Sequence, residues 1–237
     1  KRSPTQLQRI KREVWIMSTR YNPSIVRDSL ALYVDAANVK SYTGSGTTWK
    51  DISGKGANGT LTNGPVHNGD YMTFDGTNDF STHGNDSSVQ FTNNFSADIW
   101  VRPHAVDQDT TIFSRDNGSN RQWWIFLQNN ESIWWSIEGV GNAQSPTGLY
   151  TANTWFHICG TYNGSTMVNY VNGTARTTTG SLSGNVSSGT ANLNIGNRDN
   201  NDRHLDGDVG CARLYNRALS ATEVLQNFNA QRGRFGV

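Results

Sequence analysis

Apolar and polar residues alternate along much of the chain, and the clearest case is the aromatic segment 121–138. Successive side chains of a β-strand point to opposite faces of the sheet. Every second residue from Trp123 to Leu127 is apolar and shares one face, whereas Trp124 and Phe126 share the other. The first half of the segment therefore predicts a β-strand.

The second half of this segment repeats the pattern after a polar break at residues 129–131. Every second residue from Ile133 to Ile137 is apolar, and Trp134 points to the opposite face. Two alternating runs joined by a short polar turn are typical of a β-hairpin. One face of this hairpin is entirely apolar, so we expect it to lie in a core.

The opposite face of the hairpin mixes aromatic and polar side chains, and it has three interpretations. Sugar rings stack on aromatic side chains while polar neighbours bind their hydroxyls. Protein interfaces use the same residue types. Alternatively, an N-terminal helix or a long loop covers the face and makes it core. The candidate ligand-binding residues, for a glycan or a protein, are Trp124, Phe126, Trp134, Arg121, Gln128 and Asn142.

Short apolar runs continue from Leu30 onward, separated by Gly, Asn and Asp at spacings of about 8 to 20 residues. No helical pattern intervenes between them, which argues against a parallel α/β sheet. The pattern predicts an all-β fold, a two-sheet antiparallel jelly-roll sandwich. At the end of the chain, Ser220 and Glu223 form a capping box that predicts one short C-terminal helix, after which Arg232 and Arg234 are expected in a flexible tail.

The first 27 residues differ from the rest and predict a separate basic arm, with the sandwich occupying residues 28–237. Ser3 and Pro4 are typical of a helix start, and apolar residues then recur at helical spacing to residue 17. Residues 1–30 carry a net charge of +5, so the remainder carries about −4. A short amphipathic basic helix needs a surface to pack on. The predicted anchoring residues are Leu7, Ile10, Arg9, Lys11, Arg12, Val14 and Trp15.

The composition narrows the setting in which the chain works. No apolar run approaches the roughly 20 residues that a membrane span needs, and no apolar segment typical of a signal peptide follows the N-terminal charges. Cys159 and Cys211 fit folding in a reducing cytoplasm, although their pairing stays open. We expect neither a membrane span nor a nucleic-acid partner.

The sequence lacks the residue patterns of common hydrolases. The chain contains four glutamates, and none belongs to the paired-carboxylate strand patterns of retaining glycosidases. Its five histidines show no metal-catalytic spacing, and no nucleophile elbow is present. We therefore predict that the protein is not an enzyme, and glycan hydrolysis is the third-ranked function.

Calcium is a candidate cofactor, because Asp and Asn oxygens suit this hard cation. Acidic and amide residues concentrate in the segment 197–208 and in the turn 75–79. The alternative is that these residues cap turns and bind no metal. The candidate ligands are Asp199, Asp202, Asp206, Asp75 and Asp79.

Several segments, taken in chain order, resemble the concanavalin A-like lectin superfamily, specifically its laminin G-like jelly-roll branch. They are LALYVDAANVKSYTGSGTTWKDISGKGANGTLTNGP, MTFDGTNDF, FSADIWVRP, TWFHICGTYNGSTMVNYVNG, LNIGNRD and LDGDVGCARLYNRALSATEV. The likeness covers residues 29–230. It implies two curved antiparallel sheets, with ligands on the concave sheet or rim loops, and one calcium ion near the rim in many relatives.

The opening segment, without a signal peptide or catalytic pair, also resembles lectin-like domains in structural proteins of tailed bacteriophages. This resemblance implies a virion surface protein, a capsid decoration or fibre component, made in the host cytoplasm. Its arm would bind the major capsid protein or another virion protein, it would form a homo-oligomer in the particle, and its sandwich would meet host or environmental glycans. The alternative is a stand-alone bacterial carbohydrate-binding lectin or adhesin.

Overall fold

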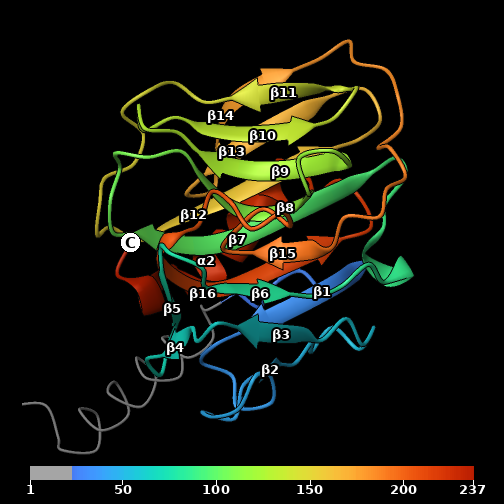
Figure 1. Ribbon diagram of the computed structural model, residues 1–237. Coiled ribbons are helices and arrows are strands. Elements are labelled where there is room, and N and C mark those ends of the chain that lie inside the picture. The colour runs from blue at the N-terminus through green and yellow to red at the C-terminus, as the bar shows by residue number, and fades with distance from the viewer. Residues whose placement is uncertain (1–22) are drawn as a thin grey trace, which may run out of the picture.

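The computed structural model describes residues 23–237, and they form two antiparallel β-sheets packed face to face (Figure 1). The first sheet contains β1 (Leu30–Asp35), β4 (Val66–His67), β5 (Met72–Asp75), β7 (Phe95–Pro103), β12 (Phe156–Tyr162), β13 (Met167–Val171), β14 (Thr174–Thr179) and β16 (Asp206–Tyr215). The second contains β2 (Thr48–Trp49), β3 (Gly59–Thr62), β6 (Phe80–Thr82), β8 (Thr110–Asp116), β9 (Arg121–Leu127), β10 (Ile133–Ile137), β11 (Gly141–Gln144) and β15 (Leu193–Ile195). Residues 23–237 also contain two helices, the 3₁₀ helix η1 (Ser87–Val89) and the α-helix α2 (Ala221–Phe235).

Strands distant in the sequence lie side by side, as expected for a jelly roll. The first sheet has the order β14-β13-β12-β7-β16-β5-β4, with β1 also paired to β16. The second has the order β11-β10-β9-β8-β15-β6-β3-β2. The predicted all-β, two-sheet antiparallel jelly-roll sandwich is therefore confirmed.

The core lies between the two sheets and is rich in aromatic rings. The predicted hairpin is β9 and β10, with Trp135 paired to Ile125 in the ladder. Trp123 and Trp135 are fully buried, and each ring contacts Phe95. Gly160 lies directly beneath Trp135, where a Cβ atom would overlap the indole. The apolar face of the hairpin is thus core, as its alternation predicts.

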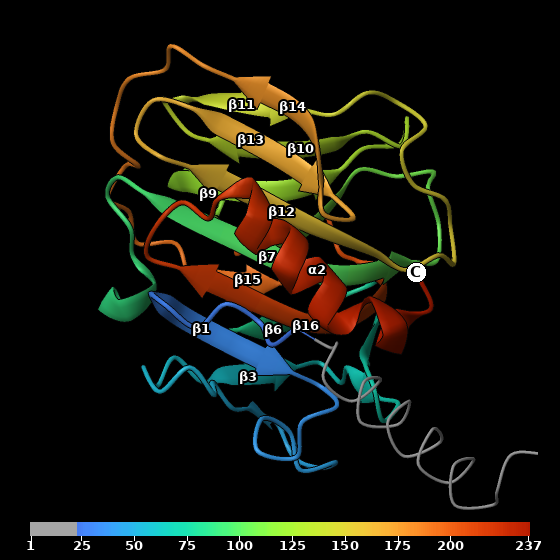
Figure 2. The ribbon, with the colours of Figure 1, turned by 180° about the vertical axis from the view of Figure 1, so that it is seen from behind.

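Helix α2 covers the outer face of the first sheet (Figure 2). Phe228 and Phe235 stack on the fully buried Trp100, with ring centroids 5.7 and 4.3 Å away. The predicted capping box is present, because the Ser220 side chain and Glu223 each satisfy the other's backbone N–H. The expectation of a flexible tail is wrong, since the helix continues through Arg232 and Arg234 to Phe235. The helix extends beyond the predicted end because Phe235, its last residue, is buried against Trp100.

Polar side chains join the two sheets at the edge where β11 and β14 meet. The Thr177 hydroxyl donates to the carbonyl oxygen of Gln144 at 2.6 Å. Asn169 donates from its side-chain amide to the carbonyls of Ile133 and Ala143, at 2.9 and 3.1 Å. These bonds link β13 and β14 of the first sheet to backbone carbonyls of β10 and β11 in the second sheet. They also hold β10 and β11 in place.

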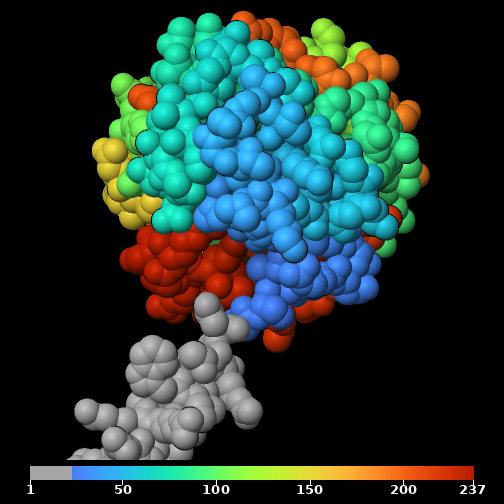
Figure 3. All heavy atoms as spheres, turned by 90° about the horizontal axis from the view of Figure 1, so that it is seen from below, coloured from blue at the N-terminus to red at the C-terminus, as the bar shows by residue number. Residues whose placement is uncertain are grey.

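The beginning of the described chain packs on α2 and β16 rather than standing apart. The backbone N–H of Val26 donates to the Asn227 side chain at 2.8 Å, and the Tyr215 hydroxyl donates to the Val26 carbonyl at 3.0 Å. Seen from below, the blue segment lies beside the red C-terminal residues (Figure 3). The seven predicted anchoring residues lie outside the described residues, and the division at residue 27 stays a prediction. Among residues 23–237, no helix is long and apolar enough to span a membrane.

Candidate ligand-binding cleft

The mixed face of the β9–β10 hairpin is the outer face of the second sheet. Trp124 lies opposite Ser136 in the ladder, and Trp134 lies opposite Phe126. Trp124 and Trp134 are half-buried, in contrast to the fully buried Trp123 and Trp135 of the inner face. Strand alternation alone therefore separates the two core tryptophans from the two that contact solvent.

A loop from Gly196 to Leu205, between β15 and β16, crosses part of this outer face (Figure 1). The Thr111 N–H donates to the Arg203 carbonyl at 3.0 Å, which ties the loop to β8. The Arg203 guanidinium carbon lies 4.7 Å from the ring centroid of Phe126, and Phe126 is only 5% exposed. A long loop therefore covers the Phe126 side chain, and ligand binding by this residue stays a prediction.

Beside the covered area, the outer face holds an open cleft of about 420 Å³. It is lined by Arg121, Trp124, Trp134, Ser136, Ile137, Glu138, Gly139, Val140, Gly141 and Asn142. Four of the six predicted ligand-binding residues meet there, namely Arg121, Trp124, Trp134 and Asn142. Gln128 does not line the cleft, since its side chain accepts hydrogen bonds from Ser132 and Gln144, at 2.8 and 3.2 Å.

The turn after β10 supplies three of the cleft residues that the sequence did not predict, Glu138, Gly139 and Val140. Residues 138–140 connect β10 to β11, and Gly139 adopts a φ of 73° that favours glycine. This turn brings Glu138 and Val140 to the rim of the cleft. The sequence did contain a signal for this turn, because the pair Glu138-Gly139 follows directly after an alternating strand and is typical of a tight turn.

Arg121 covers one face of Trp124. Its guanidinium carbon lies 3.9 Å from the ring centroid, a cation–π distance. Its Nε lies 3.3 Å from the buried carboxylate of Asp116, and its Nη1 lies 3.8 Å from Glu138. A sugar could stack on this face of Trp124 only after displacing Arg121, so Trp134 is the better platform.

Two polar atoms at the cleft floor have no hydrogen-bond partner within residues 23–237, namely the Nε1 of Trp134 and the hydroxyl of Ser136. Both are shielded from solvent. A buried polar group without a partner costs about 1–3 kcal/mol. A ligand that shifts the Trp134 ring and supplies an acceptor would recover part of this free energy.

The candidate calcium ligands do not form one site. Asp75 accepts hydrogen bonds from the backbone N–H groups of Thr77 and Asn78, at 2.8 and 3.2 Å, and the bond from Thr77 is the main reason that the pKa of Asp75 is lowered. Asp79 accepts from the N–H of Asp75 at 3.2 Å, and Asp206 pairs with Asp75 in the β16–β5 ladder.

The other two candidates lie in the loop over the second sheet. Asp199 accepts from the backbone and side chain of Asn192, at 2.8 and 2.9 Å, and Asp202 lies 3.4 Å from Arg198. In the described part of the chain, no three His, Cys, Asp or Glu side chains are placed to hold a metal ion together. The observed geometry is that of turn capping and ion pairing, and calcium binding stays a prediction.

The cleft offers little for acid–base catalysis. Glu138 is the one carboxylate among its ten lining residues, whereas glycoside hydrolysis commonly uses two. The lining instead combines indole rings, an amide, a guanidinium and a carboxylate, which suits noncovalent recognition of a polar ligand.

A jelly-roll sandwich with a partly exposed aromatic cleft on one sheet defines a lectin-like module. A family model described as the concanavalin A-like lectin/glucanases superfamily matches residues 74–225, and the chain belongs to this family. A search of curated protein sequences found no match.

Several solved structures share the fold at low sequence identity. A domain of the Geobacillus stearothermophilus arabinanase AbnA, solved with arabinotriose, is 19% identical with a TM-score of 0.63, covering 84% of this chain and 98% of that one. The botulinum neurotoxin serotype D binding domain is 15% identical with a TM-score of 0.63, covering 87% of this chain and 53% of that one.

A mutant Trypanosoma rangeli sialidase with trans-sialidase activity is 13% identical with a TM-score of 0.68, covering 95% of this chain and 39% of that one. This chain therefore spans about half of the toxin binding domain and two fifths of the sialidase. At such identities the likeness shows the fold alone.

Proposed function

We propose that the protein is a non-catalytic glycan-binding module and that the sugar lies in the Trp124–Trp134 cleft. The observation that carries the proposal is the pair of partly exposed indoles that line an open cleft of about 420 Å³. Soluble domains bury most of their tryptophan surface, so two such rings in one concavity indicate a ligand.

The chemistry of the cleft supports a sugar. The ring of Trp134 offers an apolar face to the C–H groups of a pyranose, and its indole N–H lacks a partner in the described part of the protein. Asn142 is exposed at the rim and can donate and accept hydrogen bonds. Arg121 and Glu138 place a positive and a negative side chain at the same rim. Arg121 can donate hydrogen bonds to sugar hydroxyls, and Glu138 can accept hydrogen bonds from them.

Glycan binding is tested by screening the full chain on a glycan array and measuring the best ligand by calorimetry. We expect Trp134→Ala to weaken binding about tenfold, equivalent to about 1.4 kcal/mol. Trp155→Ala is the matched control, because Trp155 is also half-buried but lies outside the cleft. The proposal fails if the folded chain binds no glycan, or if Trp134→Ala binds as tightly as the unmodified chain.

We further propose that the module is displayed on the surface of a virion through its basic arm. The charge asymmetry supports this role, since the net +5 of residues 1–30 suits an acidic seat on a larger assembly. Multiple copies on a particle would also strengthen weak sugar contacts. Removal of residues 1–22 should abolish incorporation into particles and leave glycan binding intact. A truncated chain that still enters particles would contradict the anchoring role and favour a stand-alone bacterial lectin or adhesin.

A further inference from the structure

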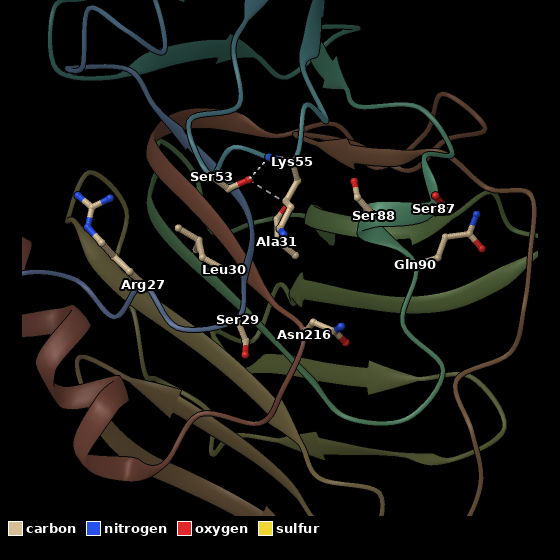
Figure 4. A pocket seen from close by; sticks show the side chains of 10 residues that line it. All are labelled: Arg27, Ser29, Leu30, Ala31, Ser53, Lys55, Ser87, Ser88, Gln90 and Asn216. Carbon is tan, nitrogen blue, oxygen red and sulfur yellow. Dashed lines mark hydrogen bonds between the residues drawn. The ribbon is translucent and has the colours of Figure 1, made fainter.

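A second cleft, of about 490 Å³, lies between the start of β1, the loop after Ile52 and the helix η1 (Figure 4). It is lined by Arg27, Ser29, Leu30, Ala31, Ser53, Lys55, Ser87, Ser88, Gln90 and Asn216. It shares no residue with the tryptophan cleft. Its lining contains two cationic side chains, a set of hydroxyls and amides, and no carboxylate.

Neither of the two cations, Arg27 and Lys55, forms an ion pair within residues 23–237. The Lys55 side chain extends past Ala31 toward the middle of the cleft, and Arg27 stands at one end (Figure 4). Both side chains are exposed, so they can reorient onto a ligand without breaking an existing bond.

Three carboxylates that lie close in the sequence to lining residues make contacts elsewhere. Asp28 lies 2.8 Å from the Nε of Arg217. Asp51 is buried and accepts from the Ser53 hydroxyl at 2.8 Å and the Gly56 N–H at 2.9 Å. Asp86 accepts from the Ser88 N–H at 2.7 Å, and its bonds to Ser88 lower its pKa. These three groups do not line the cleft.

The neutral lining provides hydrogen-bonding groups at fixed positions. Asn216 and Ser29 are held together by a 2.8 Å backbone bond, in which the Asn216 N–H donates to the Ser29 carbonyl. Their side chains, and that of Ser87, make no recorded hydrogen bond to the described residues. Such a set matches the hydroxyl groups of a sugar, as the cations match an acidic substituent.

We propose that this cleft binds a small polyhydroxylated anion, of which a uronic acid is the simplest example, with its carboxylate on Lys55, while Arg27 adds a second positive charge at one end of the cleft. A cation in reach of a carboxylate forms a charge-assisted hydrogen bond, about twice as strong as a neutral one. The remaining hydroxyls of the sugar bind the serine and asparagine side chains. This site is independent of the tryptophan cleft, and the two together would allow one chain to hold two parts of an acidic glycan.

The test is a titration of the full chain with glucuronate, glucose and sulfate, followed by NMR and calorimetry. We expect glucuronate to bind more tightly than either glucose or sulfate. Lys55→Gln should weaken glucuronate binding about tenfold, and Arg27→Gln less. Added salt should weaken it further, because the interaction is electrostatic and exposed.

Trp134→Ala separates this site from the tryptophan cleft. Unchanged glucuronate binding in Trp134→Ala, with loss in Lys55→Gln, supports the second site. Loss in Trp134→Ala with no change in Lys55→Gln overturns it and leaves the proposed function standing. Equal affinities for sulfate and glucuronate overturn the recognition of a sugar, and a chain that binds no glucuronate overturns the whole inference.

Discussion

Two fully buried arginines show how single residues set the balance of charge inside this sandwich. Arg213 donates to the buried carboxylate of Asp98 at 2.8 Å, and His157 lies 2.9 Å from the other oxygen of that carboxylate. Arg115 instead donates to carbonyl oxygens, those of Val89 and Ala191, at 3.1 and 3.0 Å. A charged side chain is costly to bury unless such partners satisfy it.

The pKa values of these groups follow from their partners. Burial alone would raise the pKa of Asp98, but the nearby charges of Arg213 and His157 hold it well below its ordinary value. Burial lowers the pKa of Arg115 to about 10, with a smaller opposing effect from Asp199. Arg115 nevertheless stays charged at neutral pH.

Asp98→Asn should be strongly destabilising, by about 3–5 kcal/mol, because it leaves Arg213 buried without a counter-charge. Urea unfolding at pH 7 measures this loss. Asp107→Asn, at an exposed carboxylate with no recorded ion pair among the described residues, is the control and should change stability by less than about 0.5 kcal/mol. Similar stability in both variants would contradict the role given to Asp98.

The same carboxylate predicts a pH dependence. Because the folded-state pKa of Asp98 is depressed, its contribution to stability is complete above the unfolded pKa of about 4 and is lost as the pH falls below it. The unmodified chain should therefore lose stability between about pH 4 and pH 2 more steeply than Asp98→Asn. Parallel pH profiles for the two chains would refute this assignment.

At the scale of elements, the docking of α2 depends on how closely it approaches β16. Gly210 lies directly beneath the ring of Phe235, where a Cβ atom would overlap it. Gly233, which lies in α2 itself, has open space where a Cβ atom would be. The two glycines therefore have opposite requirements.

Gly210→Ala should destabilise the fold by about 1–3 kcal/mol, because it forces Phe235 away from Trp100. Gly233→Ala should be neutral or stabilise by up to about 1 kcal/mol, since alanine favours helix and meets no neighbour. Thermal and urea unfolding of the pair provide the measurement. A stable Gly210→Ala protein with unchanged Trp fluorescence would show that the helix tolerates a wider separation.

The start of α2 carries its own ion pair. A hydrogen bond from Arg217 at 2.6 Å lowers the pKa of Glu223 to about 2. Glu223→Gln keeps the capping geometry and removes the charge, so we expect a loss below about 1 kcal/mol at pH 7. The difference should disappear as the pH falls from about 4.5 toward 2, where Glu223 itself becomes protonated. A constant difference across this range would assign the effect to capping rather than to charge.

At the scale of the whole molecule, the two cysteines report on the closure of the helix over the sheet. In the first sheet, Cys159 of β12 lies opposite Asp98 of β7, and Cys211 of β16 lies opposite Trp100 of β7. Strand β7 therefore separates the two thiols, and both are free. Burial raises the pKa of Cys211 to about 12 and that of Cys159 well above its ordinary value. Their pairing, left open by the sequence, does not occur in this fold.

Both thiols should therefore react slowly with an aromatic disulfide reagent in the native state and rapidly in urea. Gly210→Ala should accelerate the native reaction, because it loosens the helix above them. The absorbance of the released thiolate gives the rate. Rapid labelling of the unmodified native chain would show that α2 opens far more readily than its packing indicates.

The sequence alone determined the architecture and the division of the aromatic residues. Alternation placed Trp123 in the core and Trp124 at the surface, and the capping box placed the start of α2, because strand periodicity and helix caps are local properties. The family followed from short segments in a fixed order, each of which matches a turn or strand of the sandwich.

Only the tertiary structure decided which parts of the surface are open to a ligand. Phe126 and Trp134 face the same side of the hairpin, yet Arg203 covers one and leaves the other beside a cleft. The second cleft joins Arg27, Lys55 and residues near η1, which are distant along the chain. Where a loop lands, and which distant residues meet, depends on the packing of the whole sandwich, and local patterns do not contain that information.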